Sequence, residues 1–255
     1  MPEEKNQSKF PSEVIDLPSK GKLYPEEHPC SSGQIEIKYM TAREEDILTS
    51  QNLIRKGVVI QKLLDSLILT PGVTTDDLII GDKNAIMVAA RILAYGPEYK
   101  SEVTNPITGI KFTHEFNLAD CPFKEVPWLK KMKENNFEMT LPISKTHITY
   151  KLLTGKEEKI IDKEIQQIKK LGSDIVPDLT TRLRYIITSV DGDTERKTIN
   201  SFVDNMLSRD SLALRKELTS NSPDIELTQE IEIEGESVKV DIPVTAQFFW
   251  PNTQS

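Results

Sequence analysis

The chain has 255 residues, of which 37% are hydrophobic and 28% charged, and its formal net charge is −8. This composition is typical of a globular protein with one large core or two smaller ones. Its lysines and arginines are dispersed, which argues against nucleic-acid binding through phosphate contacts. No apolar run approaches the roughly 18 residues of a membrane helix, and the first residues lack the apolar core of a secretion signal. We therefore expect a protein that works in a cytoplasm, or in a particle assembled there, without membrane contact.

Residues 1–34 contain five of the fifteen prolines, which predicts an extended N-terminal arm. Its apolar residues, among them Leu17, Leu23 and Tyr24, could lie against a domain or against a partner. Alternating apolar residues at 35–39 then predict a strand.

The stretch "YMTAREEDILTS", residues 39–50, places an arginine and three carboxylates at four consecutive positions, Arg43, Glu44, Glu45 and Asp46. Thr41 followed by Glu44 fits a capping box, in which each residue bonds a backbone amide of the other. Glu44, Glu45 and Asp46 also lie where the helix dipole favours negative charge. The competing interpretation is an active site built on Arg43 and these carboxylates, which would need further groups from elsewhere.

The rest of the chain alternates helices with hairpins. Helices are predicted over 58–69, 177–190 and 209–218, and over 154–171 up to Gly172. The segment 74–96 is predicted to hold a short turn or helix and then a long apolar helix closed by Gly96, and 191–207 a polar turn followed by a short helix. A strand-like segment is predicted over 137–153. Hairpins are predicted over 101–123 and 225–244, and the chain then reaches an aromatic end at 248–250.

The order of elements in the first half recurs in the second. Setting "IEIKYMTAREEDI" over "ITYKLLTGKEEKI" places Thr154, Glu157 and Glu158 on Thr41, Glu44 and Glu45. The hairpin glycines Gly109 and Gly235 match at a larger offset, so residues were added in between. We therefore predict an α+β fold with two similar lobes from an internal duplication, each with a strand, capped helices and a terminal hairpin. The first lobe is predicted over 35–125, a connector over 126–140 and the second lobe over 141–255.

No arrangement of residues predicts catalysis, a metal or a cofactor. Cys30 and Cys121 are far apart and have no C-x-x-C partner, and the chain contains no Gly-rich phosphate loop. A metal-dependent hydrolase would have to bring Glu44 and Glu45 together with Asp191 and Asp193 of "DGDT". A helix cap and a polar turn explain these residues more simply.

Six motifs give the chain a family resemblance: "TAREEDIL", "GDKN", "YGPEY", "VDGD", "RDSLALR" and "FFWP", in this order. Over residues 15–251 the chain resembles the base plate protein family of T-even-like contractile-tailed bacteriophages. That family consists of baseplate hub subunits and hub-assembly factors, so the resemblance implies a non-enzymatic structural or chaperone-like protein. It implies other hub or tail proteins as partners and leaves oligomerisation open. The expected location is the virion tail baseplate, or the host cytoplasm during assembly.

The resemblance also bears on the hairpins. Relatives carry a C-P-x-C-G turn there, whereas this chain has Asn105–Gly109 and "LTQEIEIEG" without cysteine. The resemblance therefore implies zinc-ribbon-like hairpins that bind no metal. A prophage-derived cellular adaptor is a further alternative. The residues expected to contact partners are Leu17, Leu23, Tyr24, Asp82, Asp210, Arg215, Phe248, Phe249 and Trp250.

Overall fold

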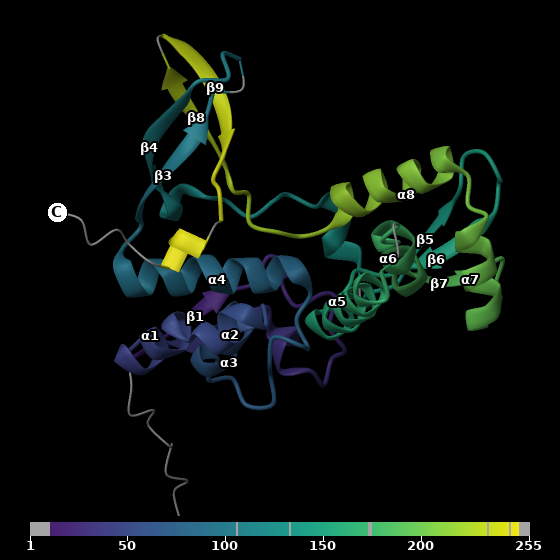
Figure 1. Ribbon diagram of the computed structural model, residues 1–255. Helices are drawn as coiled ribbons and strands as arrows, with labels where there is room; N and C mark the ends of the chain where they lie inside the picture. The colour runs from purple at the N-terminus through teal and green to yellow at the C-terminus, as the bar shows by residue number, and fades with distance from the viewer. Residues whose placement is uncertain are drawn as a thin grey trace, which may run out of the picture.

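The computed structural model describes residues 11–249 except 106, 133, 173, 174, 234 and 245. The described residues form eight α-helices and small antiparallel sheets, which confirms the predicted α+β class. Figure 1 shows three parts: a first module of β1–β2 and α1–α4, a second module of β5–β7 and α5–α8, and a pair of hairpins. Within the described ranges, no helix has the length and apolarity that crossing a bilayer requires.

The first module pairs β1 (Ser12–Asp16) with β2 (Gln34–Lys38), antiparallel, and packs them against four helices. The helices are α1 (Ala42–Thr49), α2 (Gln51–Arg55), α3 (Val59–Leu67) and α4 (Ile80–Tyr95). Apolar residues at helical spacing turn one face of α3 inward, where Leu63, Leu64 and Leu67 have no exposed surface. Each such leucine stabilises the fold by about 1.5–3 kcal/mol relative to an exposed one.

The described part of the predicted N-terminal arm is folded into this module rather than extended away from it. It contributes β1, the short helix η1 (Pro29–Ser32) and the turn between them. Leu17 is 0% exposed and Leu23 is 3% exposed, so this segment supplies part of the core. The spacing of the prolines predicted turns in this segment. The turns pack against the module because this removes the apolar residues between them from water.

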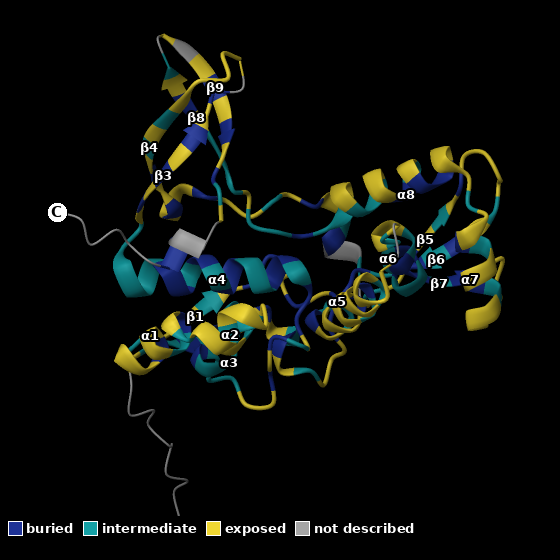
Figure 2. Cartoon of the chain, in the orientation of Figure 1, coloured by how far each residue is buried: buried dark blue, intermediate teal, exposed yellow. Residues whose placement is uncertain are grey.

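The second module contains a three-stranded sheet in the order β5–β6–β7. Its strands are β5 (Phe137–Thr140), β6 (His147–Tyr150) and β7 (Ile187–Val190), and its helices are α5 (Gly155–Lys170), α6 (Asp178–Ile186), α7 (Arg196–Asp204) and α8 (Ser208–Asn221). The single helix predicted over 177–190 is wrong at its end, because α6 stops at Ile186 and the chain continues as β7. The residues of β7 are mostly β-branched and pair with β6. Figure 2 shows that α5, α7 and α8 keep their outward faces exposed.

The two hairpins pack against each other, although one follows each module. They are β3 (Glu98–Thr104) with β4 (Lys111–Asn117), and β8 (Thr228–Ile233) with β9 (Glu236–Asp241). Short helices η2 (Leu118–Asp120) and η3 (Pro127–Lys131) lead away from β4, and η4 (Ala246–Phe249) follows β9. Phe123 forms an isolated bridge with Ile225 before β8, and Phe248 contacts the ring of Tyr99 in β3. The segment that follows the first hairpin therefore packs beside the start of the second hairpin, and the segment that follows the second packs beside the start of the first.

The two modules join through backbone contacts. The amides of Gly155 and Lys156, at the start of α5, donate to the carbonyls of Leu78 and Asp76, each at 2.9 Å. A Cβ atom at Gly155 would lie 2.0 Å from the oxygen of Thr75. A Cβ atom at Gly81, at the start of α4, would lie 1.8 Å from the oxygen of Pro223. Only glycine permits these two approaches, so the junction depends on both positions.

Replacing either junction glycine by alanine should separate the modules, because the obstructing atoms are backbone oxygens that cannot rotate away. We expect Gly81→Ala and Gly155→Ala to lower the free energy of unfolding in urea by about 1–3 kcal/mol and to raise the radius of gyration in small-angle X-ray scattering. Gly57→Ala is the control: its Cβ would meet nothing within 4 Å, so it adds only left-handed backbone strain of about 1 kcal/mol. An unchanged radius of gyration in both junction variants would contradict the role of the glycines.

Candidate protein-interaction site

The charged stretch at residues 41–46 begins α1 with a complete capping box. The carboxylate of Glu44 accepts from the backbone amide of Thr41 at 3.0 Å and from its hydroxyl at 2.6 Å. Lys38, at the end of β2, adds an ion pair to the same carboxylate at 2.8 Å. Glu44 is 1% exposed, so its charge is held inside the module. This arrangement fixes the angle between β2 and α1.

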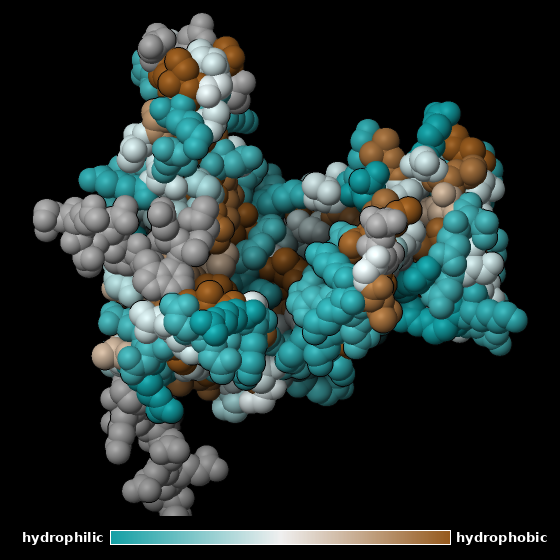
Figure 3. Space-filling model, viewed as in Figure 1, coloured by the Kyte–Doolittle hydropathy of each residue, from teal (hydrophilic) through white to brown (hydrophobic). Residues whose placement is uncertain are grey.

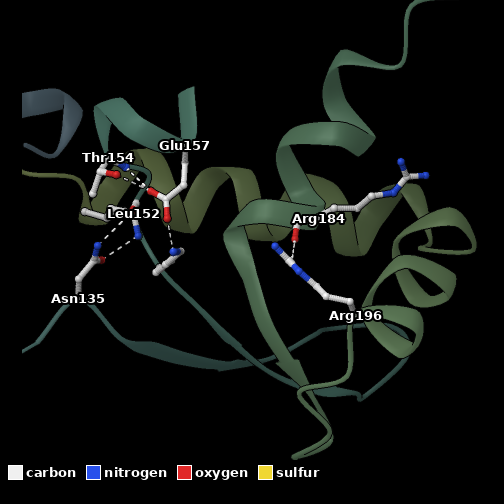
Figure 4. Close-up of polar contacts among 7 residues, drawn as sticks. Asn135, Leu152, Thr154, Glu157, Arg184 and Arg196 are labelled. Carbon is white, nitrogen blue, oxygen red and sulfur yellow. Dashed lines mark hydrogen bonds and ion pairs between the residues drawn. The ribbon is translucent and has the colours of Figure 1, made fainter. Parts of the chain in front are cut away.

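The start of α5 repeats this arrangement, as Figure 4 shows for Thr154 and Glu157. The carboxylate of Glu157 accepts from the amide of Thr154 at 2.8 Å and from its hydroxyl at 2.7 Å. Lys151 forms the ion pair that corresponds to Lys38. Sequence reasoning missed both lysines, although the pattern K-x-x-T-x-x-E-E occurs at each site.

The side-chain amide of Asn135 ties the connector to the second module. It donates to the carbonyl of Leu152 and accepts from the amide of Leu152, each at 2.8 Å.

The two capping glutamates, one buried and one partly buried, have depressed pKa values. Burial acts to raise the pKa of Glu44, but hydrogen bonds from Lys38 and Thr41 outweigh it and hold the pKa below its usual range. The same balance, with Lys151 and Thr154, lowers the pKa of Glu157. Both carboxylates are therefore ionised partners in structural contacts.

The remaining charged residues of the two motifs divide into exposed and paired groups. Arg43, Glu45 and Asp46 are exposed on α1, although Glu45 accepts a long hydrogen bond from the Tyr95 hydroxyl at 3.5 Å. Glu158 instead accepts two hydrogen bonds from one nitrogen of Arg182, at 2.6 Å each, and these link α5 to α6. Lys156, at the position that corresponds to Arg43, is exposed on α5. The α1 residues and Lys156 are therefore accessible to a partner.

Three of the residues predicted to contact partners, Leu17, Leu23 and Tyr24, lie in the core instead. A fourth, Asp82 in the first turn of α4, has no exposed surface. Its carboxylate accepts from the Ser19 amide at 2.9 Å, the Ser19 hydroxyl at 2.6 Å and the Tyr24 hydroxyl at 2.7 Å. Burial raises the pKa of Asp82, and the Ser19 and Tyr24 donors oppose that shift. Asp82 therefore holds the N-terminal turn against α4.

Asp210, in the first turn of α8, has the corresponding role in the second module. It accepts from the amides of Ile143 at 2.8 Å and Ser144 at 3.0 Å and is 1% exposed. Burial acts to raise its pKa, but these backbone donors lower it below the usual range. Asp210 thus forms no ion pair with Arg215, and Arg215 is exposed on α8.

The aromatic end also differs from its predicted docking role. Phe248 is 0% exposed and Phe249 is 1% exposed, and the ring of Phe248 lies against Tyr99 of β3 and against Phe249. Trp250 lies outside the described residues. The two phenylalanines are therefore buried in the fold and are not available to a partner in this conformation.

The carboxylates of the hydrolase hypothesis are not brought together. Glu44 is at the start of α1, whereas Asp191 and Asp193 precede α7 at the opposite end of the molecule in Figure 1. Asp193 accepts from the amide of Glu195 at 2.8 Å and the hydroxyl of Thr198 at 2.7 Å, and so caps α7. Among the described residues, no group of three or more His, Cys, Asp or Glu side chains could hold a metal ion.

An apolar surface that sequence reasoning missed lies at the far end of the second module. We call it the α8 patch: Ile143 (40% exposed), Leu207 (48%) and Leu212 (44%). The bond from the Ile143 amide to Asp210 places the β5–β6 turn beside the start of α8. Figure 3 shows hydrophobic atoms gathered at this end of α8. Neighbouring exposed apolar side chains of this kind are typical of protein-binding surfaces.

The comparison with known families assigns the chain to a family. A family model described as T4 bacteriophage base plate protein matches residues 11–250. The chain belongs to this family. Membership confirms the resemblance seen in the motifs and supports a structural or assembly role in a phage baseplate, in contact with other baseplate proteins. No curated protein and no solved structure matches the chain.

Replacing the buried carboxylate of α1 should cost stability in a pH-dependent way. We expect Glu44→Gln to lower the free energy of unfolding at neutral pH by about 1–3 kcal/mol, because it weakens a charge-assisted network. The lowered pKa of Glu44 stabilises the fold above the unfolded value of about 4.3, and this stabilisation is lost as the pH falls through the folded value. The variant should therefore differ from the parent chain at pH 7 and approach it near pH 2 in urea titrations.

Glu45→Gln is the matched control, because its carboxylate is exposed one residue later. It should change stability by less than about 0.5 kcal/mol. Equal losses in the two variants would show that the buried network does not carry the effect.

Proposed function

We propose that this protein is a non-enzymatic component or assembly factor of a contractile-tailed phage baseplate hub and acts through protein–protein contacts. The observation that carries the proposal is the family match over residues 11–250. The carboxylates at 44, 157, 82 and 210 support it, because each serves a structural contact within the chain. The fold then works as a rigid scaffold that presents surfaces to partners.

The contact surfaces are the exposed groups that remain once the core is accounted for. On the second module these are the α8 patch and Arg215; on the first module, Arg43, Glu45 and Asp46. An apolar centre with charged residues around it is the usual composition of a binding surface between proteins. The two sets lie at opposite ends of the molecule in Figure 1, so the chain can bridge two partners.

We further propose that the two modules arose by duplication. The repeated capping boxes with their lysines support this origin, and so do the turns held by Asp82 and Asp210. The turns share a further detail: Lys20 and Lys145 both adopt positive φ, at 50° and 61°. Positive φ is uncommon for lysine, so the coincidence favours a common ancestor.

The hairpins fit the proposal of a zinc-ribbon-like turn without metal. The side-chain oxygen of Asn105 accepts from the amides of Ile107 at 2.8 Å and Thr108 at 3.2 Å. It thereby organises the β3–β4 turn at the position where relatives are expected to carry cysteine. A hydrogen-bonded amide can hold such a turn without a bound ion.

Mass spectrometry of purified tailed particles from the encoding phage tests the location. We expect peptides of this chain in the particles at a stoichiometry comparable with other hub proteins. Presence only in the soluble assembly lysate would assign the chain to assembly and exclude a permanent subunit. Absence from both particles and baseplate intermediates would contradict the proposal altogether.

The double variant Leu207→Ser, Leu212→Ser tests the α8 patch. Both side chains are exposed, so thermal unfolding should be nearly unchanged. Removing the apolar centre of a contact should weaken co-purification with co-expressed tail proteins by tenfold or more. Leu171→Ser is the control, since Leu171 is 85% exposed outside the patch. Equal co-purification by the parent chain, the double variant and Leu171→Ser would show that the α8 patch does not contact the tail proteins.

A further inference from the structure

A groove runs between the N-terminal turn of the first module and the segment that follows the first hairpin. It consists of two hollows of 530 Å³ and 320 Å³ that share Lys20 and Phe123. We call it the Phe123 groove. One wall is the turn at residues 16–22, and the other is the segment 123–129.

The lining of the Phe123 groove is mixed, with slightly more apolar than polar surface. Leu17, Val126 and Leu129 line it and are almost fully buried. Phe123 is 36% exposed and lines both hollows. An aromatic ring exposed over an apolar floor offers a site for one large apolar side chain.

The rim of the groove is basic, although the chain as a whole carries a net charge of −8. Lys20 and Lys22 are exposed and form none of the ion pairs found among the described residues. Lys124 donates to the carbonyl of Thr219, and its charge partly offsets the burial that raises the pKa of Asp224. Asp16 and Glu125 also line the groove, so its three lysines outnumber the lining carboxylates by one. The groove therefore favours a negatively charged ligand, whereas the net negative charge of the whole chain repels one.

Both walls are fixed before any partner arrives. The turn is held by the bond from the Ser19 amide to Asp82 and by the bond from the Leu17 amide to Gly33 at 2.8 Å. The opposite wall is held by the bond from the Lys124 amide to Asp224, also at 2.8 Å. A preformed groove binds with a smaller loss of conformational entropy than one that must order.

We propose that the Phe123 groove binds an extended acidic segment with one large apolar side chain, supplied by another baseplate protein. The apolar side chain packs on Phe123, and flanking carboxylates contact Lys20, Lys22 and Lys124. Asp16 and Glu125 disfavour a continuous phosphate backbone, which carries a charge at every unit. The identity of the partner rests on the proposed function, whereas the chemistry of the groove does not.

Fluorescence anisotropy with the full chain tests the groove. The probe is a labelled ten-residue peptide of aspartate and glutamate with one central phenylalanine, and the reference peptide replaces its acids by lysine. We expect saturable binding of the acidic peptide only, weakened as salt rises from about 0.05 to 0.2 M because the lysines are exposed. The variant Lys20→Glu, Lys22→Glu should raise Kd at least tenfold, and Phe123→Ser should raise it severalfold.

Lys145→Glu is the matched control, because Lys145 has the same positive φ as Lys20 in the corresponding turn of the second module. It should leave Kd unchanged, and thermal unfolding should show that all variants are folded. Failure of the acidic peptide to bind, an equal change in Lys145→Glu, or tighter binding of single-stranded DNA would each overturn the proposal. Particle mass spectrometry reports separately on the baseplate role, so the two proposals can fail independently.

Discussion

The contact between the start of α5 and residues 75–79 is the constraint on which the rest of the structure depends. It brings two backbone segments so close that no side-chain carbon fits at Gly155, and Gly81 plays the same part against Pro223. Because both contacts involve backbone, they define one relative position of the modules instead of a range. That position carries the two hairpins to the same side of the molecule, where they bury each other. The Phe123 groove exists for the same reason, since its second wall is held by Asp224 of the second module's trailing segment.

The spacing of residues within one element predicted local structure well, but it did not predict contacts between residues that are far apart in the sequence. Thr41 with Glu44 predicted a capping box because both halves lie within one helical turn. Asp82 and Asp210 were predicted to face partners because a carboxylate at the start of a helix is normally solvated. Their donors come from turns 58 to 67 residues earlier, and no periodicity predicts that meeting. The prediction for Phe248 was wrong for a different reason. The aromatic residues at 248–250 predicted a docking element, but Phe248 packs on Tyr99 of the same chain. The groove had no signal in the sequence, since its two walls are brought together only by the fold.

The packing of Phe248 on Tyr99 has a consequence for synthesis. The first hairpin leaves the ribosome well before η4, so the face of Tyr99 that Phe248 covers stays open in between. A chain that stops before η4 displays this unshielded aromatic face, which proteases and chaperones recognise. The contact therefore lets the cell discard such a copy before it can enter an assembly.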